Sequence, residues 1–316
     1  MTVLYEYLGI PFGWLLRLIY NSIGFQNYAI SIVLLTLFAR LLMIPSTISQ
    51  QKGQAKMQRL NAKIRKIQTK YAGDQRKIQE ETQALYQREG YNPMSAGCAP
   101  MAVQFLLLFG LIGAIYYPLS HFLFIDKEQV QLLTDAVKNL DLGSSVMNKS
   151  TILSELLVVQ HIDKLQDVAG VTQATYDKIA TVNFDFFGLF SLGEVPRTSE
   201  HKIIWIIPVL SFLSSFATGL YTQIRQKKTN PTANQNPMMM GCMTLGMPLF
   251  SLYFVVNYPA GIGIYWIASS IFGFLSTVII GQVYNPNKMI ARIMVDETIE
   301  RRSKEEVIKR AAANKE

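Results

Sequence analysis

Five long apolar stretches constrain this chain more than any other feature of its sequence. A helix that spans a bilayer needs about 20 mostly apolar residues, and each stretch is about that long. Only 16% of the 316 residues are charged, against about 25% in soluble domains. The sequence therefore predicts an all-α membrane protein with five transmembrane helices. With flanking residues the predicted spans are 27–49, 98–125, 201–224, 238–256 and 257–284, with kinks expected at Pro118, Pro208 and Pro248.

Lysine and arginine gather on one side of these spans, which orients the chain. One side receives 21 Lys and Arg. The other receives 1 when the loop 126–202 is left out, because that loop exceeds the roughly 60 residues over which the positive-inside rule holds. We therefore expect the N-terminus outside and the C-terminus in the cytoplasm. Between the spans we expect an outer loop domain at 126–200, a cytoplasmic loop at 225–237 and a basic cytoplasmic tail at 285–316.

The first 26 residues predict an N-terminal interfacial helix on the outer membrane surface. No basic segment precedes its apolar part and no small-residue cleavage site follows it, so a signal peptide is not indicated. Arg17 and Asn21 fall off its apolar face, as expected of a helix that lies in the interface. That apolar face comprises Phe12, Leu15, Leu16, Ile19, Tyr20 and Ile23. In the outer loop, Ile152–Val168 predicts a further helix.

The basic segment 50–97 predicts a cytoplasmic antiparallel helical hairpin. Met57, Leu60, Ile64, Ile67 and Tyr71 form a heptad seam, and Gly73-Asp74 follows as a turn. Its excess of positive charge has two interpretations. It sets the topology, which charge alone favours, or it docks an acidic partner such as ribosomal RNA or an anionic lipid surface. The candidate docking residues are Lys56, Arg59, Lys63, Arg65, Lys66 and, in the tail, Arg301 and Arg302.

Arg40 is the only charged residue inside the apolar stretches themselves (28–45, 100–125, 203–224, 238–256 and 260–284), so no Asp or Glu lies in any of them. A mid-bilayer arginine costs about 2.5–3.5 kcal/mol on insertion scales, so it needs water, a counter-charge or a route to the headgroups. Arg40 either snorkels to the cytoplasmic interface, five residues before Pro45, or faces a wet cavity. The polar residues that could line such a cavity, or simply bond neighbouring helices, are Gln104, Ser211, Ser214, Ser215, Thr218, Gln223, Ser269 and Ser270.

Residue types that carry cofactor chemistry are sparse. The two cysteines, Cys98 and Cys242, cannot supply a four-ligand zinc site. The three histidines stand 40 residues apart, which gives no metal-ligand pair of helical spacing. We therefore expect no metal, no other cofactor and no enzymatic activity.

These landmarks together resemble the YidC family of membrane protein insertases. Five motifs in this order on this topology are specific as a set, and they cover nearly the whole chain apart from the outer loop. They are LFARLLMIP around Arg40, the basic hairpin, NPMSAGCAPMAVQ (Asn92–Gln104), NPMMM (Asn236–Met240) and YPAGIGIYW (Tyr258–Trp266). The resemblance implies the five-span bacterial form, in the plasma membrane, although the outer loop is long for that form.

The resemblance also implies a mechanism and partners. A hydrophilic groove, open to the cytoplasm and the lipid, would hold Arg40, which would attract acidic residues in the outer tail of a client. Gln104, Gln223, Ser215 and Ser269 are the expected polar lining. The expected slide for the client's transmembrane segment consists of Met101, Phe105, Met239, Met243, Met247 and Phe250. A monomer is expected to meet client membrane proteins, membrane lipids, the Sec translocon, and the ribosome or signal-recognition components.

Two other functions stay open at the level of the sequence. In a channel or transporter, Arg40 would line a substrate path, although no inverted repeat or matched pair of interrupted spans is visible. In a membrane scaffold, the hairpin would recruit a soluble partner and Arg40 would only snorkel. Replacing Arg40 by Ala separates the three functions. An insertase would first lose clients with acidic outer tails, a transporter would lose flux, and a scaffold would lose nothing.

Overall fold

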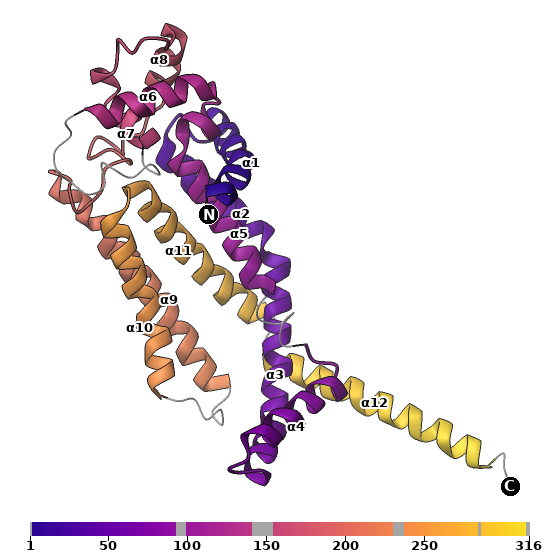
Figure 1. Ribbon diagram of the computed structural model, residues 1–316. Coiled ribbons are helices and arrows are strands. Elements are labelled where there is room, and N and C mark those ends of the chain that lie inside the picture. The colour runs from indigo at the N-terminus through magenta and orange to yellow at the C-terminus, as the bar shows by residue number, and fades with distance from the viewer. Residues whose placement is uncertain (1, 93–98, 141–153, 230–236, 284–285, 314–316) are drawn as a thin grey trace. The chain divides into compact units, whose positions relative to one another are not determined.

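The structure, a computed structural model, describes residues 2–92, 99–140, 154–229, 237–283 and 286–313. Over these ranges the chain is helical without any β-strand, and one isolated bridge joins Asp185 to Ser191 (Figure 1). It divides into two compact units. Unit 1 comprises Met1–Leu42, Val103–Gln223 and Gln235–Phe274, and unit 2 comprises Met43–Ala102, Ile224–Asn234 and Leu275–Glu316.

Twelve α-helices are described, with three short helices of other types between them. The α-helices are α1 (Thr2–Ser22), α2 (Tyr28–Leu42), α3 (Ile44–Lys70), α4 (Gln75–Arg88), α5 (Ala99–Tyr116), α6 (Lys127–Asn139), α7 (Ser154–Gln160), α8 (Gln173–Ala180), α9 (Ile206–Thr229), α10 (Pro237–Asn257), α11 (Ala260–Val283) and α12 (Pro286–Ala313). The short ones are the π-helix η2 (Pro118–Phe122) and the 3₁₀ helices η5 (Ile162–Lys164) and η6 (Lys202–Trp205).

Two helices within the described ranges are long and apolar enough to cross a membrane. They are Lys202–Arg225 and Ala260–Val283. A third is reached if α2 and α3, which break at Met43, count as one broken span, and Thr244–Asn257 is a shorter apolar helix. The membrane-spanning character is therefore visible in the helices, and the count of five stays a prediction.

Helix α1 packs most of its predicted apolar face against other parts of the protein. Leu16, Ile19 and Tyr20 are buried, and α1 contacts η2 and α2. Gly13 permits this approach, because a Cβ there would overlap the backbone of His121 in η2. Ile23 of the same face is 58% exposed, and the interfacial location of the helix stays a prediction. The helix also has a second set of apolar residues at helical spacing, Tyr7, Ile10, Trp14 and Leu18, which are exposed. Only the first set formed the predicted apolar face.

The core of unit 1 is built where α1, α2 and η2 meet residues 126–140 and 154–200, which belong to the predicted outer loop and form the outer segment. Tyr28 is 1% exposed and donates a hydrogen bond to the Ala114 carbonyl oxygen at 3.2 Å. Its ring lies edge-on to Phe122 with the centroids 5.2 Å apart, and 4.5 Å from the ring of Phe184. Asn27 caps α2 by accepting a hydrogen bond from Ile30 N. The outer segment is thus part of the core of unit 1.

The helix expected over Ile152–Val168 is two short helices. Residues 152 and 153 lie outside the described ranges, α7 ends at Gln160, and His161 leaves the helical region at φ −119° and ψ 25° before η5 begins. The chain then turns so that Leu165 is buried, and its carbonyl oxygen accepts a 2.6 Å hydrogen bond from the hydroxyl of Tyr176. A tertiary contact replaces the hydrogen bonds that a longer helix would have made.

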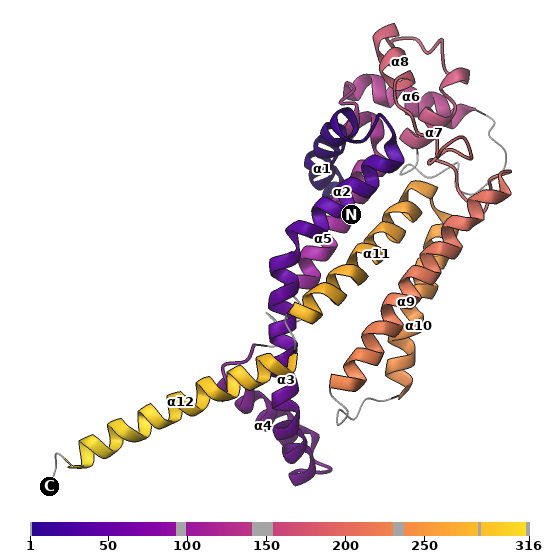
Figure 2. The same cartoon turned by 180° about the vertical axis from the view of Figure 1, so that it is seen from behind.

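Helices α9 and α10 run side by side in Figures 1 and 2, and pairs of serine hydroxyls join α9 to α10 and to α11. Pro208 lies in the first turn of α9, where its missing N–H breaks no helical hydrogen bond, whereas Pro248 lies inside α10. Pro118 opens η2 after α5 has ended at Tyr116, so it ends a helix and does not kink one.

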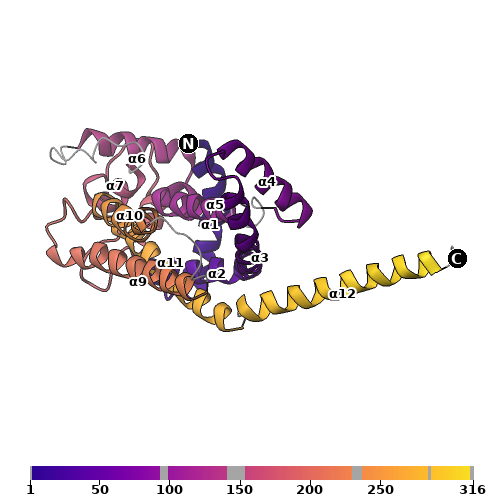
Figure 3. The same ribbon diagram turned by 90° about the horizontal axis from the view of Figure 1, so that it is seen from below.

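In unit 2, α3 and α4 lie next to each other (Figure 3) and α12 contacts α3. The turn between α3 and α4 follows from two residues. Gly73 adopts φ +95°, which costs glycine little, and Asp74 caps α4 by accepting a hydrogen bond from Lys77 N at 3.1 Å. Of the seam residues, Leu60 is 1% exposed and Met57 accepts a contact from the hydroxyl of Tyr86.

Candidate functional site

Arg40 lies in the last turn of α2 and is held against α11. Its Nη2 donates a hydrogen bond to the hydroxyl of Ser269. One turn further along α11, a Cβ at Gly273 would stand 3.6–3.7 Å from the guanidinium atoms, so the cation lies flat on the small residue there. Tyr265, buried one turn earlier, is an electrostatic neighbour of Arg40. The structure thus brings Arg40 and Ser269 together, as candidate site residues that lie 229 positions apart.

The other candidate hydroxyls face a different neighbour. Ser215 of α9 lies 3.1 Å from the hydroxyl of Ser270 on α11. Adjacent residues on a helix point about 100° apart, so Ser215 and Arg40 meet different sides of α11. Ser211 pairs with Ser251 of α10 at 3.2 Å, and both are fully buried. These pairs are ordinary interhelical hydrogen bonds between small polar residues.

The remaining lining and slide candidates are placed as follows. Gln223 is half-buried on α9. Phe105 on α5 and Met247 and Phe250 on α10 are exposed to 43%, 66% and 50%, as expected of side chains that face lipid or an apolar partner. Gln104, Met101, Met239 and Met243 lie in α5 and α10, and their side chains fall outside the part that the structure describes.

Several candidate docking cations make contacts within their own helix pair. Lys63 of α3 forms an ion pair with Glu89 just after α4, and Lys56 donates to the carbonyl oxygen of Gly90 at 3.1 Å. Arg59 and Arg65 are half-buried, Lys66 is exposed, Arg301 pairs with Glu305 at 3.5 Å, and Arg302 is exposed. Lys66 and Arg302 are therefore more accessible to a partner than Lys56 and Lys63.

Comparison with known proteins decides the family. The family model described as "60Kd inner membrane protein" matches residues 18–288, which include α2, α5, α9, α10 and α11. The chain belongs to this family, the YidC family. It is 28% identical to "Membrane protein insertase YidC 2" of Bacillus anthracis over 85% of this chain and 77% of the relative. It is 26% identical to "Membrane protein insertase MisCA" of Bacillus subtilis over 87% and 78%. It is 24% identical to "Membrane protein insertase YidC 2" of Listeria innocua over 98% and 81%.

Within this YidC-family chain, sequence reasoning missed Arg225. Its Nη1 donates to the Thr277 carbonyl oxygen at 3.0 Å, and a Cβ at Gly281 would overlap its guanidinium. Arg225 stands one residue beyond the predicted span 201–224, so the sequence indicates only a basic loop residue there. The signal in the sequence is an arginine at the end of one predicted span and a glycine near the end of another, which together could indicate a contact between the two helix ends.

Glu155 was also missed. It is a 4% exposed carboxylate on α7. Its Oε2 accepts hydrogen bonds from Leu119 N at 2.8 Å and Ser120 N at 2.9 Å, and its Oε1 accepts one from the Ser120 hydroxyl at 2.5 Å. Burial raises the pKa of Glu155 to about 7, although the hydrogen bonds lower it. The carboxylate ties the outer segment to the N–H groups that open η2.

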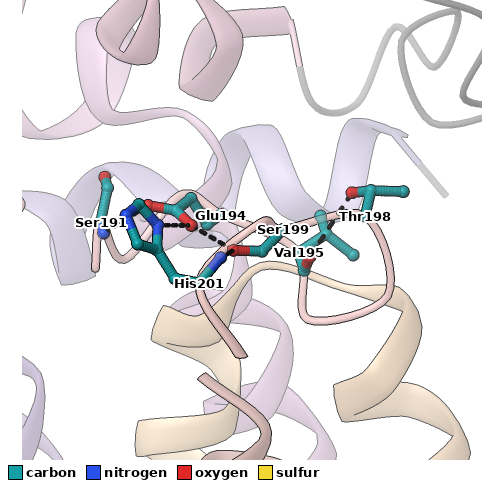
Figure 4. A network of polar contacts seen from close by, with 6 residues as sticks. All are labelled: Ser191, Glu194, Val195, Thr198, Ser199 and His201. Carbon is teal, nitrogen blue, oxygen red and sulfur yellow. Dashed lines mark hydrogen bonds and ion pairs between the residues drawn. The ribbon is translucent and has the colours of Figure 1, made fainter. Parts of the chain in front are cut away.

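A second polar cluster lies within residues 191–201, just before η6 (Figure 4). Glu194 accepts hydrogen bonds from Ser199 at 2.5 Å, from Ser191 N at 2.8 Å and from His201 Nδ1 at 3.0 Å. Burial raises the pKa of Glu194, but these bonds outweigh it and leave the pKa below its usual value. The Glu194 carbonyl oxygen accepts from Ala260 N at 2.8 Å, so the cluster caps the first turn of α11.

Proposed function

We propose that this protein is a membrane protein insertase, which moves transmembrane segments of client membrane proteins from the cytoplasm into the lipid bilayer. The observation that carries the proposal is the family match over residues 18–288. It is joined by the similarity to relatives that are named membrane protein insertases, which covers most of the length of each relative. The apolar helices of the chain agree with a site of action in the bilayer. Its clients would be membrane proteins, and it would act with or without the Sec translocon.

The proposed topology has five spans in a bacterial plasma membrane, with the N-terminus outside. It is supported by 21 Lys and Arg on the proposed cytoplasmic side against 1 on the other, the long loop left out. In this topology the basic α3, α4 and α12 face the cytoplasm, where the ribosome, signal-recognition components or the Sec translocon would meet them. The chain would act as a monomer.

Arg40 is the proposed docking charge for a client. An arginine within the hydrocarbon layer costs about 2.5–3.5 kcal/mol on insertion scales, and its hydrogen bond to Ser269 offsets part of that cost. An acidic residue in the outer tail of a client would offset more, because charge-assisted hydrogen bonds are worth about 1.5–3 kcal/mol. A hydrophilic groove that contains Arg40 would therefore draw acidic tails into the bilayer.

The transmembrane segment of the client would then leave along apolar side chains of α5 and α10. Phe105, Met247 and Phe250 are exposed enough to contact it. Methionine is flexible and polarizable, and so tolerates apolar segments of different shape. In this mechanism the energy comes from burial of the client's apolar segment in the bilayer and from the membrane potential that acts on its charged tail.

The function is tested by reconstitution. The purified protein in liposomes should insert a single-span client with a short acidic outer tail, and protein-free liposomes should not. Arg40→Ala should lower insertion and Arg40→Lys should restore part of it, whereas Lys178→Ala, a matched loss of one exposed outer charge, should leave insertion unchanged. Insertion no better than in protein-free liposomes would contradict the proposal.

The same variants separate the other two functions. A channel or transporter would conduct a solute across these liposomes and lose that flux with Arg40→Ala. A scaffold would insert nothing, and Arg40→Ala would not change its binding of a soluble partner. Either pattern would replace the insertase as the function of the chain.

A further inference from the structure

Helix α1 has an exposed apolar stripe opposite its buried face. Tyr7, Ile10, Trp14 and Leu18 recur at helical spacing on one side, and they are exposed to 73%, 45%, 58% and 50%. The buried face of the same helix is formed by Leu16 and its neighbours. A helix that is apolar on two faces is unusual at a water interface, because only one of the faces is covered by the protein. The uncovered face therefore needs an apolar environment of its own.

A pocket of about 360 Å³ opens at one end of this stripe. That volume is at the lower end of the range of about 300–1,000 Å³ for small-molecule sites. Almost all of the surface that the pocket exposes is apolar, so its two polar residues line it mainly through their carbon atoms. The lining residues are Trp14, Arg17, Leu18, Asn21 and Phe124.

Arg17 is the only Lys or Arg among the first 26 residues, and it is one of the residues that line this pocket. Its guanidinium lies over the ring of Phe124, 5.7 Å from the centroid. Within the described ranges no carboxylate lies within ion-pair distance of it. Phe124 adopts φ +53°, a conformation uncommon for an aromatic residue, and it is 40% exposed. The ring orients the cation and leaves its N–H groups available to an anion.

We propose that Arg17, beside this pocket, binds the phosphate headgroup of an anionic phospholipid, and that an acyl chain of the same lipid occupies the apolar pocket. The Arg17 guanidinium would donate to phosphate oxygens in the bidentate manner that suits it, and the Asn21 amide would add a donor. Trp14 and Phe124 would lie at the level of the headgroups, where aromatic side chains are enriched. The acyl chains would run along Leu18 and the rest of the stripe.

A lipid fits this site better than a soluble anion does. The single cation adjoins an apolar surface that continues for three turns of α1, and a free phosphate would leave that surface uncovered. A phospholipid would cover both, because its phosphate would meet the cation and its acyl chains would cover the apolar surface. The inference requires only that α1 lies at a membrane, so it stands apart from the insertase proposal.

Trp14 supplies the measurement. In a Trp205→Phe, Trp266→Phe background it is the one tryptophan left of three. The protein is reconstituted in phosphatidylcholine vesicles that contain a small fraction of brominated phosphatidylglycerol or, in parallel, of brominated phosphatidylcholine, because bromine quenches a neighbouring indole. Both lipids carry a phosphodiester, but the choline cation of phosphatidylcholine neutralises its charge. We therefore expect the anionic lipid to be preferred about fivefold, the equivalent of about 1 kcal/mol for one basic residue near an anionic surface.

Arg17→Gln should remove the preference, and Arg17→Lys should keep most of it. Lys178→Gln, which removes an exposed charge from the outer segment, should not change it. Equal quenching by both lipids, or an unchanged preference in Arg17→Gln, would overturn the proposal. Competition by soluble glycerol phosphate at the concentration of the lipid would show a free-anion site and would overturn it too. A chain that inserts no client but still discriminates between the lipids would contradict only the proposed function.

Discussion

Neutralising Glu155 should flatten the dependence of stability on pH. The carboxyl group is buried, and its pKa is raised from 4.5 to about 7 in the folded protein. The folded state therefore binds more protons than the unfolded state between these two pH values. The contribution of Glu155 to the free energy of unfolding is thus fully present below pH 4.5 and is lost as the pH rises through 7. At about 1.36 kcal/mol for each pH unit between the two pKa values, the whole difference is about 3 kcal/mol, most of which is lost between pH 5 and pH 8.

Glu155→Gln keeps the shape of the side chain. Its amide oxygen can accept from the N–H groups of Leu119 and Ser120, and its NH₂ can donate to the Ser120 hydroxyl, which accepts in place of donating. The variant should therefore match the wild type near pH 5 to within about 1 kcal/mol, and be more stable than the wild type at pH 8 by roughly 2 kcal/mol.

The assay is chemical unfolding in a mild detergent at pH 5, 6, 7 and 8, followed by tryptophan fluorescence. Glu128→Gln, which removes an exposed carboxylate from α6, is the matched control and should track the wild type at every pH. Parallel pH dependences of Glu155→Gln and the wild type would refute the reasoning. So would a variant that is less stable at all four pH values by the same amount.

Three further predictions concern contacts outside the proposed groove. Gly281→Ala should push Arg225 off the Thr277 carbonyl oxygen and cost about 1 kcal/mol in unfolding experiments, and it should cost nothing in an Arg225→Met background; equal costs in both backgrounds would contradict the contact. Glu194→Gln should lower the pKa of His201, which the hydrogen bond and charge of Glu194 raise, and an NMR titration that shows no decrease would count against the pair. Lys63→Met should cost less than about 1 kcal/mol, because its ion pair is partly exposed, and a larger loss of thermal stability would argue that this pair is not an ordinary surface one.

Local sequence signals predicted the parts of the fold that local chemistry determines. The turn at Gly73-Asp74 needs only a residue that tolerates positive φ and a carboxylate cap, and both can be read from the sequence. Leu60, a seam residue, is buried as its heptad position predicts. The family followed in the same way, because its motifs are short and lie in a fixed order.

Tertiary contacts determined the rest. Helix α1 is apolar on two faces, and only its packing on His121 and η2 shows which face is covered. Ser269 and Ser270 look equivalent in the sequence, yet one meets Arg40 and the other meets Ser215. Glu155 gave no signal at all, because its partners are backbone N–H groups 35 and 36 residues away.

The coupling between Arg40 and the acidic tail of a client tests the insertase account most directly. Two clients that differ only by Asp→Asn in the outer tail are inserted into liposomes that contain wild-type protein or Arg40→Ala. We predict that Arg40→Ala lowers insertion of the acidic client about tenfold or more, since a charge-assisted hydrogen bond is worth about 1.5–3 kcal/mol. Insertion of the neutral client should change less than about twofold, because it has no charge for Arg40 to bind. An equal loss for both clients, or no loss for either, would contradict a role for Arg40 in receiving the tail.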